Sequence, residues 1–204
     1  MKKYYLLTVL VFFLGFTSTM YLQTKEAVKK ADKVEKKKDK AGAMTVAVMK
    51  TTMGTIELEL FEKETPKTVE NFIGLSKKGY YNGIIFHRVI DGFMIQGGDP
   101  TGTGTGGTSI WGKEFDSEIV PTLKHDKPGV LAMANRGPNT NTSQFYITLT
   151  PQTRLDGGYT IFGQVIKGMD VVKAIGKVPT KKPGDKPLKD VKIESVKIEK
   201  RDKK

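Results

Sequence analysis

A chain of 204 residues is long enough to form one domain with a substantial hydrophobic core, and it is short for two domains of ordinary size. The formal net charge of +12 comes from the two ends, because residues 44–172 carry 12 Lys and Arg against 13 Asp and Glu. This distribution argues against specific nucleic-acid binding, and the absence of cysteine excludes disulfide bonds, thiol catalysis and cysteine metal sites.

The chain begins with an uncharged apolar run followed by a lysine-rich segment. Residues 4–22 contain no charged side chain and follow Lys2 and Lys3, which is typical of an export signal or a membrane anchor. No small-residue cleavage site follows closely, which favours an uncleaved anchor and an exported, extracytoplasmic protein, either periplasmic or on the cell surface. The eight lysines of residues 25–40 oppose this orientation, because positively charged flanks prefer the cytoplasm. We assign the signal peptide or membrane anchor to residues 1–24 and a charged linker to residues 25–43.

Two helices are predicted within a domain that we expect to span residues 44–200, with a basic tail at residues 201–204. The first is predicted to begin after Thr65, a capping residue followed by proline, and to end at Gly79. The second is predicted at residues 169–175, where apolar side chains recur at helical spacing before a glycine.

Short strands are predicted in the rest of the domain. Residues 55–60 alternate polar and apolar side chains, which is the period of a half-buried strand. Residues 191–198 also alternate but change phase, which predicts a β-bulge. The other expected strands are 45–50, 86–90, 93–96, 129–134, 144–149 and 161–166. Many short strands joined by glycine turns predict a mainly β fold, namely a closed antiparallel barrel capped by helices, with a two-sheet sandwich as the alternative.

Three patterns that suggest other chemistry are weak in this sequence. The glycines of residues 102–107 match a dinucleotide-binding fingerprint, but the flanking strand and helix that give it meaning are not expected, so we predict a flexible loop. His87 and His125 have no metal-ligand spacing around them, and His87 is expected to be a hydrogen-bonded core residue. Ser143 lacks the turn of a catalytic nucleophile. We therefore expect neither a metal site nor a dinucleotide site from these patterns.

Arg88 is the most informative polar residue, because it lies among apolar and amide side chains between glycines. An arginine stays protonated and offers five donors in a fixed plane, so it can stabilise a shifting electron pair without titrating. Phe93 and Met94 can supply apolar contact, and Gln96 can hold the guanidinium in place. The alternative is a core hairpin whose arginine reaches a surface carboxylate.

Three segments of the chain resemble those of the cyclophilin peptidyl-prolyl cis-trans isomerases, in that family's order and spacing. They are FHRVIDGFMIQGGDPTGTGTGG, LAMANRGPNTNTSQFYITL and LDGGYTIFGQVIKGMDVV. The resemblance extends from about residue 44 to the end of the final strand and so covers the whole domain. It implies a closed eight-stranded antiparallel β-barrel capped by two α-helices, no cofactor, and a substrate groove on the outer face of the barrel.

The resemblance also implies roles for individual residues. Arg88 matches the catalytic arginine of the family, and Gln96 matches the glutamine that braces it. Substrate-binding positions are matched by Phe93, Met94, Ala134, Asn135, Gln144, Tyr146, Leu155 and Tyr159. Tyr146 replaces a phenylalanine and adds a hydroxyl that needs a partner. Tyr159 replaces a histidine of many eukaryotic members. Arg154 replaces a groove tryptophan, which weakens the expectation of tight cyclosporin binding.

The expected function is a monomeric peptidyl-prolyl cis-trans isomerase that acts on proline-containing peptides and unfolded clients among exported or folding polypeptides. Two alternatives stay open. The same groove can serve a non-catalytic proline-motif binding module or a holdase chaperone. The basic tails can instead be the main functional element and contact anionic lipid or an acidic polymer.

Overall fold

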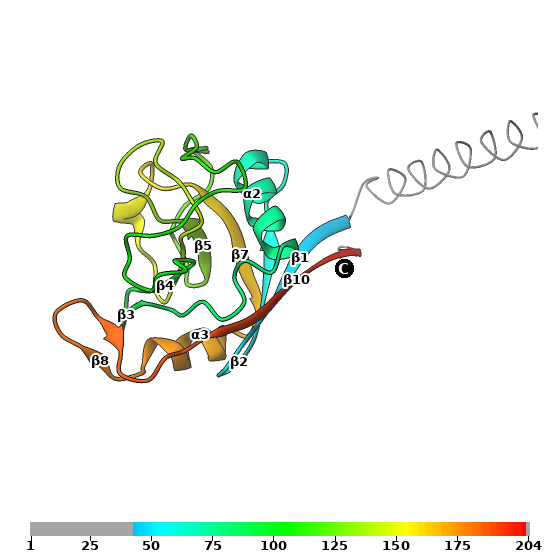
Figure 1. Cartoon of the computed structure of the whole chain (residues 1–204). Helices are drawn as coiled ribbons and strands as arrows, with labels where there is room; N and C mark the ends of the chain where they lie inside the picture. Colours follow the sequence, from blue (N-terminus) through cyan, green and yellow to red (C-terminus); the bar gives the residue numbers. More distant parts are fainter. Residues whose placement is uncertain (1–42, 203–204) are drawn as a thin grey trace, which may run out of the picture. The chain divides into compact units, whose positions relative to one another are not determined.

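The computed structural model describes residues 43–202, so the predicted anchor and nearly all of the predicted linker lie outside the described residues. Eight strands form one sheet in the order β10-β1-β2-β7-β5-β6-β4-β3 (Figure 1), and every strand pairing described in it is antiparallel. The strands are β1 Ala43–Thr51, β2 Gly54–Leu60, β3 Arg88–Ile90, β4 Met94–Gly97, β5 Val130–Met133, β6 Phe145–Thr148, β7 Ile161–Lys167 and β10 Ile193–Asp202. Because all eight of these strands belong to one sheet, the two-sheet sandwich is excluded and the predicted mainly β fold is confirmed.

The two ends of the sheet, β10 and β3, are joined by the segments that precede them rather than by a continuous ladder. Ile85 and Lys192 form an antiparallel bridge. Next to it, the Ile193 amide donates to the Ile84 carbonyl at 2.8 Å and the Phe86 amide donates to the Val191 carbonyl at 3.0 Å. The Gly83 amide also donates to the Ile193 carbonyl at 2.7 Å, so the expected barrel is closed by a few backbone bonds and not by a continuous ladder. The predicted strand 86–90 shortens to β3.

Two α-helices accompany the sheet, as predicted. Helix α2 spans Pro66–Lys77 and α3 spans Met169–Gly176. The proline at the start of α2 is as expected, but Thr65 makes no side-chain cap, and the Glu118 carboxylate accepts the amide protons of Lys67 and Thr68 instead. A distant carboxylate thus replaces the local cap because it provides the same acceptor with a full negative charge. None of the helices in the described part of the chain is long and apolar enough to cross a bilayer.

Alternate residues of the central strands serve two different apolar clusters. In β6, Phe145 and Ile147 belong to the main core, which also contains Phe72 of α2 and Val172 of α3. Tyr146 lies between them in sequence and belongs to a smaller cluster on the opposite face. Because successive side chains of a strand point to opposite faces, the same short strands build both clusters.

Three short elements were not predicted: a 3₁₀ turn at Thr153–Leu155 and a hairpin made of β8 Thr180–Lys181 and β9 Lys186–Pro187. The hairpin, orange in Figure 1, contacts β3. The 3₁₀ turn and the hairpin both lie beside the predicted site residues.

Candidate active site

The outer face of β4, β5 and β6 carries the predicted site. Gln96 of β4 lies opposite Tyr146 of β6, and Tyr146 lies opposite Ala132 of β5. Met94 lies two residues before Gln96 and therefore on the same face. The alternation that fills the main core with the neighbouring residues thus places Met94, Gln96 and Tyr146 together outside it.

Nine of the ten predicted site residues line one pocket of about 160 Å³. They are Arg88, Phe93, Met94, Gln96, Ala134, Asn135, Tyr146, Leu155 and Tyr159. The tenth, Gln144, lines an adjoining hollow of about 60 Å³ that shares Gln96, Ala134 and Asn135 with the pocket. The structure therefore brings all ten residues together.

Arg88 stands at the side of the pocket with 45% of its side chain exposed. Its ion-pair partner among the described residues is Asp185, with 3.9 Å between Arg88 Nε and Asp185 Oδ2. Asp185 lies in the β8–β9 turn, where its carbonyl accepts the Val89 amide proton at 2.8 Å. At 3.9 Å the pair is loose, and the guanidinium keeps donors for a substrate.

Gln96 does not make the expected hydrogen bond to the guanidinium of Arg88 among the contacts described for residues 43–202. Its Nε2 donates to Gln144 Oε1 at 3.0 Å. Gln144 Nε2 in turn donates to the carbonyl oxygens of Gly104 and Gly106 at 3.0 and 2.7 Å. Gln96 is thus tied to the adjoining hollow, and Asp185 is the residue that holds Arg88.

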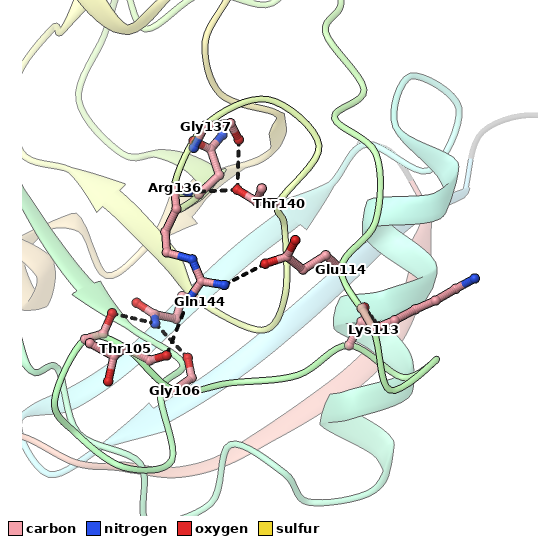
Figure 2. A network of polar contacts seen from close by, with 11 residues as sticks. Thr105, Gly106, Lys113, Glu114, Arg136, Gly137, Thr140 and Gln144 are labelled. Carbon is pink, nitrogen blue, oxygen red and sulfur yellow. Dashed lines mark hydrogen bonds and ion pairs between the residues drawn. The ribbon is translucent and has the colours of Figure 1, made fainter.

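The adjoining hollow is a polar network rather than an apolar pocket. Figure 2 shows Gln144 bound to the loop at Gly106 and Arg136 bound to Glu114, with 2.6 Å between Arg136 Nη2 and Glu114 Oε1. The Arg136 amide also donates to Thr140 Oγ1 at 2.9 Å. These bonds connect the glycine loop, the segment after β5 and the start of β6.

Asp99 holds the glycine-rich loop, which the sequence had predicted to be flexible. Its carboxylate accepts the backbone N–H groups of Thr101, Thr103, Gly104 and Gly106. Burial alone would raise the pKa of Asp99, but these bonds and the Thr101 hydroxyl outweigh it and lower the pKa to about 2. No helix follows this loop, so the glycine pattern is not a dinucleotide site.

The apolar part of the pocket comes from Phe93, Met94 and Leu155. Met94 is 2% exposed, and Leu155 is brought in by the 3₁₀ turn that the sequence did not predict. The Arg154 guanidinium lies 4.7 Å from the centre of the Phe93 ring, which is a cation–π contact. The Arg154 guanidinium therefore covers one face of the Phe93 ring.

Tyr146 finds the partner that its hydroxyl requires in His125, which sequence reasoning had set aside. The distance from Tyr146 Oη to His125 Nε2 is 2.9 Å, and the distance from His125 Nδ1 to Asp156 Oδ1 is also 2.9 Å. Burial raises the pKa of Tyr146, so its hydroxyl keeps its proton. Burial opposes ionisation of Asp156, but the hydrogen bonds from the backbone and ring of His125 lower its pKa.

The expectation for His87 was wrong in one respect. His87 is buried, yet neither ring nitrogen has a hydrogen-bond partner within the described residues. Burial lowers its pKa, which favours the neutral ring. Gly104 lies next to the His87 ring, and as a glycine it has no side chain that could bond a ring nitrogen.

An antiparallel sheet curved around a helix-capped core, with an arginine beside a small apolar pocket on its outer face, defines a class that the family comparison names. Residues 45–198 match the family model described as cyclophilin type peptidyl-prolyl cis-trans isomerase/CLD. The chain belongs to this family and is a peptidyl-prolyl cis-trans isomerase.

Individual relatives agree with this assignment. The chain is 56% identical over 154 residues to peptidyl-prolyl cis-trans isomerase-like 1 of Neurospora crassa, covering 76% of this chain and 94% of the relative. It is 55% identical over 152 residues to the mouse peptidylprolyl isomerase domain and WD repeat-containing protein 1, covering 74% of this chain and 24% of the relative.

Solved structures agree as well. A Cryptosporidium parvum cyclophilin type peptidyl-prolyl cis-trans isomerase superimposes with a TM-score of 0.75 at 45% identity, covering 76% of this chain and 98% of the other. A second structure of that protein, in the presence of the dipeptide Ala-Pro, has a TM-score of 0.73 and the same identity and coverage.

Proposed function

We propose that Arg88 is the catalytic group of this isomerase and that the pocket beside it binds the proline ring of the substrate. The observation that carries this proposal is that Arg88 lines one hollow together with Phe93, Met94 and Leu155. A cationic donor, only loosely paired among the described residues, thus lies in a pocket of about 160 Å³ whose walls include these three apolar side chains. The Ala-Pro dipeptide present with the related Cryptosporidium protein supports proline-containing peptides as the substrate class.

The chemistry requires no bond to be broken. Rotation about an X–Pro bond is slow because amide resonance must be lost, at a barrier of about 18–20 kcal/mol. As the bond twists, the proline nitrogen becomes pyramidal and gains a lone pair. A fixed cation at that nitrogen binds the twisted form more tightly than either planar isomer, which lowers the barrier. An acceleration of about 10⁴-fold requires only about 5–6 kcal/mol of such differential binding.

The pocket binds the proline side of the rotating bond, and the main chain binds the residues before the proline. The rings and side chains of Phe93, Met94 and Leu155 exclude water from the proline ring and so restrain it. Asn135 lies at the edge of the pocket with its side chain held, because Nδ2 donates to the Gly158 carbonyl at 3.0 Å and Oδ1 accepts the Gly137 amide proton at 3.2 Å. We assign the main chain of Ala134 and Asn135 to holding the residues that precede the proline.

Gln96 and Gln144 have a supporting role in this proposal. Gln96 lines both the pocket and the adjoining hollow, and its amide is oriented by Gln144. Its remaining amide proton can be donated to the substrate carbonyl that swings during rotation, and its carbonyl oxygen can accept a proton from a water beside Arg88. Tyr159 closes the pocket with its ring at 84° to the ring of Tyr146.

The test is an isomerisation assay of the full chain on an Ala-Pro peptide. We expect Arg88→Ala to lower kcat/KM by about 100-fold or more, because a single charged donor in the transition state is removed. Arg201→Ala is the matched control, since Arg201 pairs with Glu57 and Glu199 away from the pocket, and it should leave kcat/KM unchanged. Equal peptide binding by the native protein and by Arg88→Ala, with no acceleration by either, would instead support the binding module or holdase.

We also propose that the protein acts as a monomer on exported or folding chains and is attached to a membrane through residues 4–22. The uncharged run after Lys2 and Lys3 supports this placement. Mass determination of the chain from its native membrane fraction tests it. A mass that includes residues 1–24 in the membrane fraction is the expected result, and an intact chain found only in the soluble fraction would contradict it.

A further inference from the structure

We infer that His125 and Asp156 are positioning residues that turn the hydroxyl of Tyr146 away from the pocket, and that they thereby make the pocket selective for an unsubstituted proline ring. This inference rests on the proposal that the pocket binds proline. It concerns His125 and Asp156, which the proposed reaction does not use.

The hydroxyl of Tyr146 lies in the protein interior although its ring lines the pocket. The residue is 5% exposed, and Oη lies 2.9 Å from Nε2 of His125, which is completely buried and is not among the residues that line the pocket. The two rings stack at 15° with 6.0 Å between their centroids. The pocket therefore faces the apolar ring, and the polar end of the same side chain is engaged behind it.

Asp156 fixes the direction of the proton in this contact. Its Oδ1 accepts the backbone N–H of His125 at 2.8 Å and lies 2.9 Å from Nδ1 of the same residue. An ionised carboxylate only accepts, so Nδ1 of His125 carries a proton, and the ring tautomer with this proton alone leaves Nε2 as an acceptor. The Tyr146 hydroxyl is then the donor to Nε2. Lys124, with its Nζ 3.9 Å from Asp156 Oδ2, is the other charged group at this chain of bonds.

The same contacts connect two walls of the pocket. Asp156 directly follows Leu155, which lines the pocket. The carbonyl of His125 accepts the Gln152 amide proton at 2.6 Å, just before the 3₁₀ turn that carries Leu155. His125 thus holds Tyr146 on β6 and Leu155 on the 3₁₀ turn in one arrangement.

The consequence for substrates follows from desolvation. An unsubstituted pyrrolidine ring loses only apolar contact with water when it enters a pocket whose wall is a tyrosine ring. The hydroxyl of 4-hydroxyproline would lose its water there without finding a partner, because the hydroxyl of Tyr146 is already bound to His125. If the acceptor at His125 is removed, the buried Tyr146 hydroxyl is left without a partner. A rotation of the Tyr146 side chain that brings the hydroxyl to the pocket then lets it bond a hydroxylated ring.

The experiment compares four full-length proteins, the native chain, His125→Leu, Tyr146→Phe and the double variant, in their affinity for an Ala-Pro peptide and for its 4-hydroxyproline analogue. Binding is followed by NMR titration, so that the result does not depend on turnover. We expect His125→Leu to lower the preference for proline by about fivefold, the value of one hydrogen bond. The preference in Tyr146→Phe and in the double variant should stay within about twofold of the native value, because neither has a hydroxyl to release.

Two further measurements keep the inference open to refutation if His125→Leu does not fold. His125→Gln keeps an acceptor near the Nε2 position and should retain the native preference. In the native protein, a slowly exchanging hydroxyl proton of Tyr146 should be detected next to the His125 ring, and its absence would contradict the inference.

The outcomes separate this inference from the proposed function. A preference that is the same in the native protein and in His125→Leu, with both affinities lowered in parallel, would overturn the positioning role and leave the proline pocket standing. Failure of the native protein to bind either peptide would refute the proposed function itself.

Discussion

The two sides of the pocket are held in different ways. On one side, Tyr146 is tied through His125 to Asp156 by hydrogen bonds of 2.9 Å each, the first of them buried. On the other side, Arg88 has 45% of its side chain exposed and is 3.9 Å from the carboxylate of Asp185. The wall that shapes the pocket is therefore fixed in advance, and the cation that would meet the twisted bond keeps its donors free.

This difference matches what each side has to do. A wall that selects a ring by shape gains from being rigid, because less freedom is lost when the ring binds. A group that stabilises only the twisted form must keep its hydrogen-bond donors for that form, so it cannot use them in bonds to the protein. The two sides should therefore respond differently to substitution, and the glycine-rich loop beside the pocket should respond to acid.

The largest effect on peptide affinity is expected from the apolar wall. We expect Phe93→Ala to weaken binding of an Ala-Pro peptide by about 10- to 100-fold, since a buried aromatic contact of about 1.5–3 kcal/mol is lost. Isothermal titration measures this directly. Phe61→Ala is the control, because Phe61 packs against the same apolar cluster but does not line the pocket. If both variants weakened binding equally, the peptide affinity would depend on the packing of the whole cluster and not on the Phe93 ring.

The loop beside the pocket should lose stability in acid. Asp99 has its pKa lowered to about 2, so it stabilises the fold above the ordinary pKa of 3.8 and loses this contribution as the pH falls towards 2. We expect the native protein to lose about 2 kcal/mol more than Asp99→Asn between pH 5 and pH 2, as measured by urea unfolding. Asp126→Asn, at an exposed site, is the control. The same pH dependence in Asp99→Asn as in the native protein would contradict the role of Asp99.

A smaller effect is expected on the arginine side. Asp185→Asn should lower kcat by about two- to fivefold and change peptide affinity little, because a loose pair with a half-exposed guanidinium contributes only about 0.2–1 kcal/mol. Asp190→Asn, at an exposed site after the same hairpin, should have no effect. A loss as large as that expected for Arg88→Ala would show that Arg88 depends on a firm ion pair after all, and the contrast between the two sides would fail.

The fold and most of the pocket could be predicted because they follow from local pattern and from family resemblance. The alternation in residues 55–60 predicts β2 with Ile56 and Leu58 buried, as observed. The strands β4, β5 and β6 are buried on both faces, so their sequences show little alternation. Their pocket residues were therefore identified through the matched family segments and not through periodicity.

The contacts that hold the site were missed because they join distant segments. His125 is paired with Tyr146, 21 residues away, and with Asp156, 31 residues away, and no local pattern marks such contacts. The turn that carries Asp185 had a signal, since Pro183-Gly184-Asp185 is typical of a turn between two short strands. That signal predicts the turn but does not predict which side chain of the pocket it will reach.

The central claim is that Arg88 stabilises the twisted bond and not the bound peptide as such. The most direct measurement is the cis–trans exchange rate of an Ala-Pro peptide at saturating native protein or Arg88→Ala, by NMR exchange spectroscopy. We predict that peptide affinity changes by less than about tenfold and that exchange on the protein slows by about 100-fold or more. Exchange at the native rate on saturated Arg88→Ala would contradict the account.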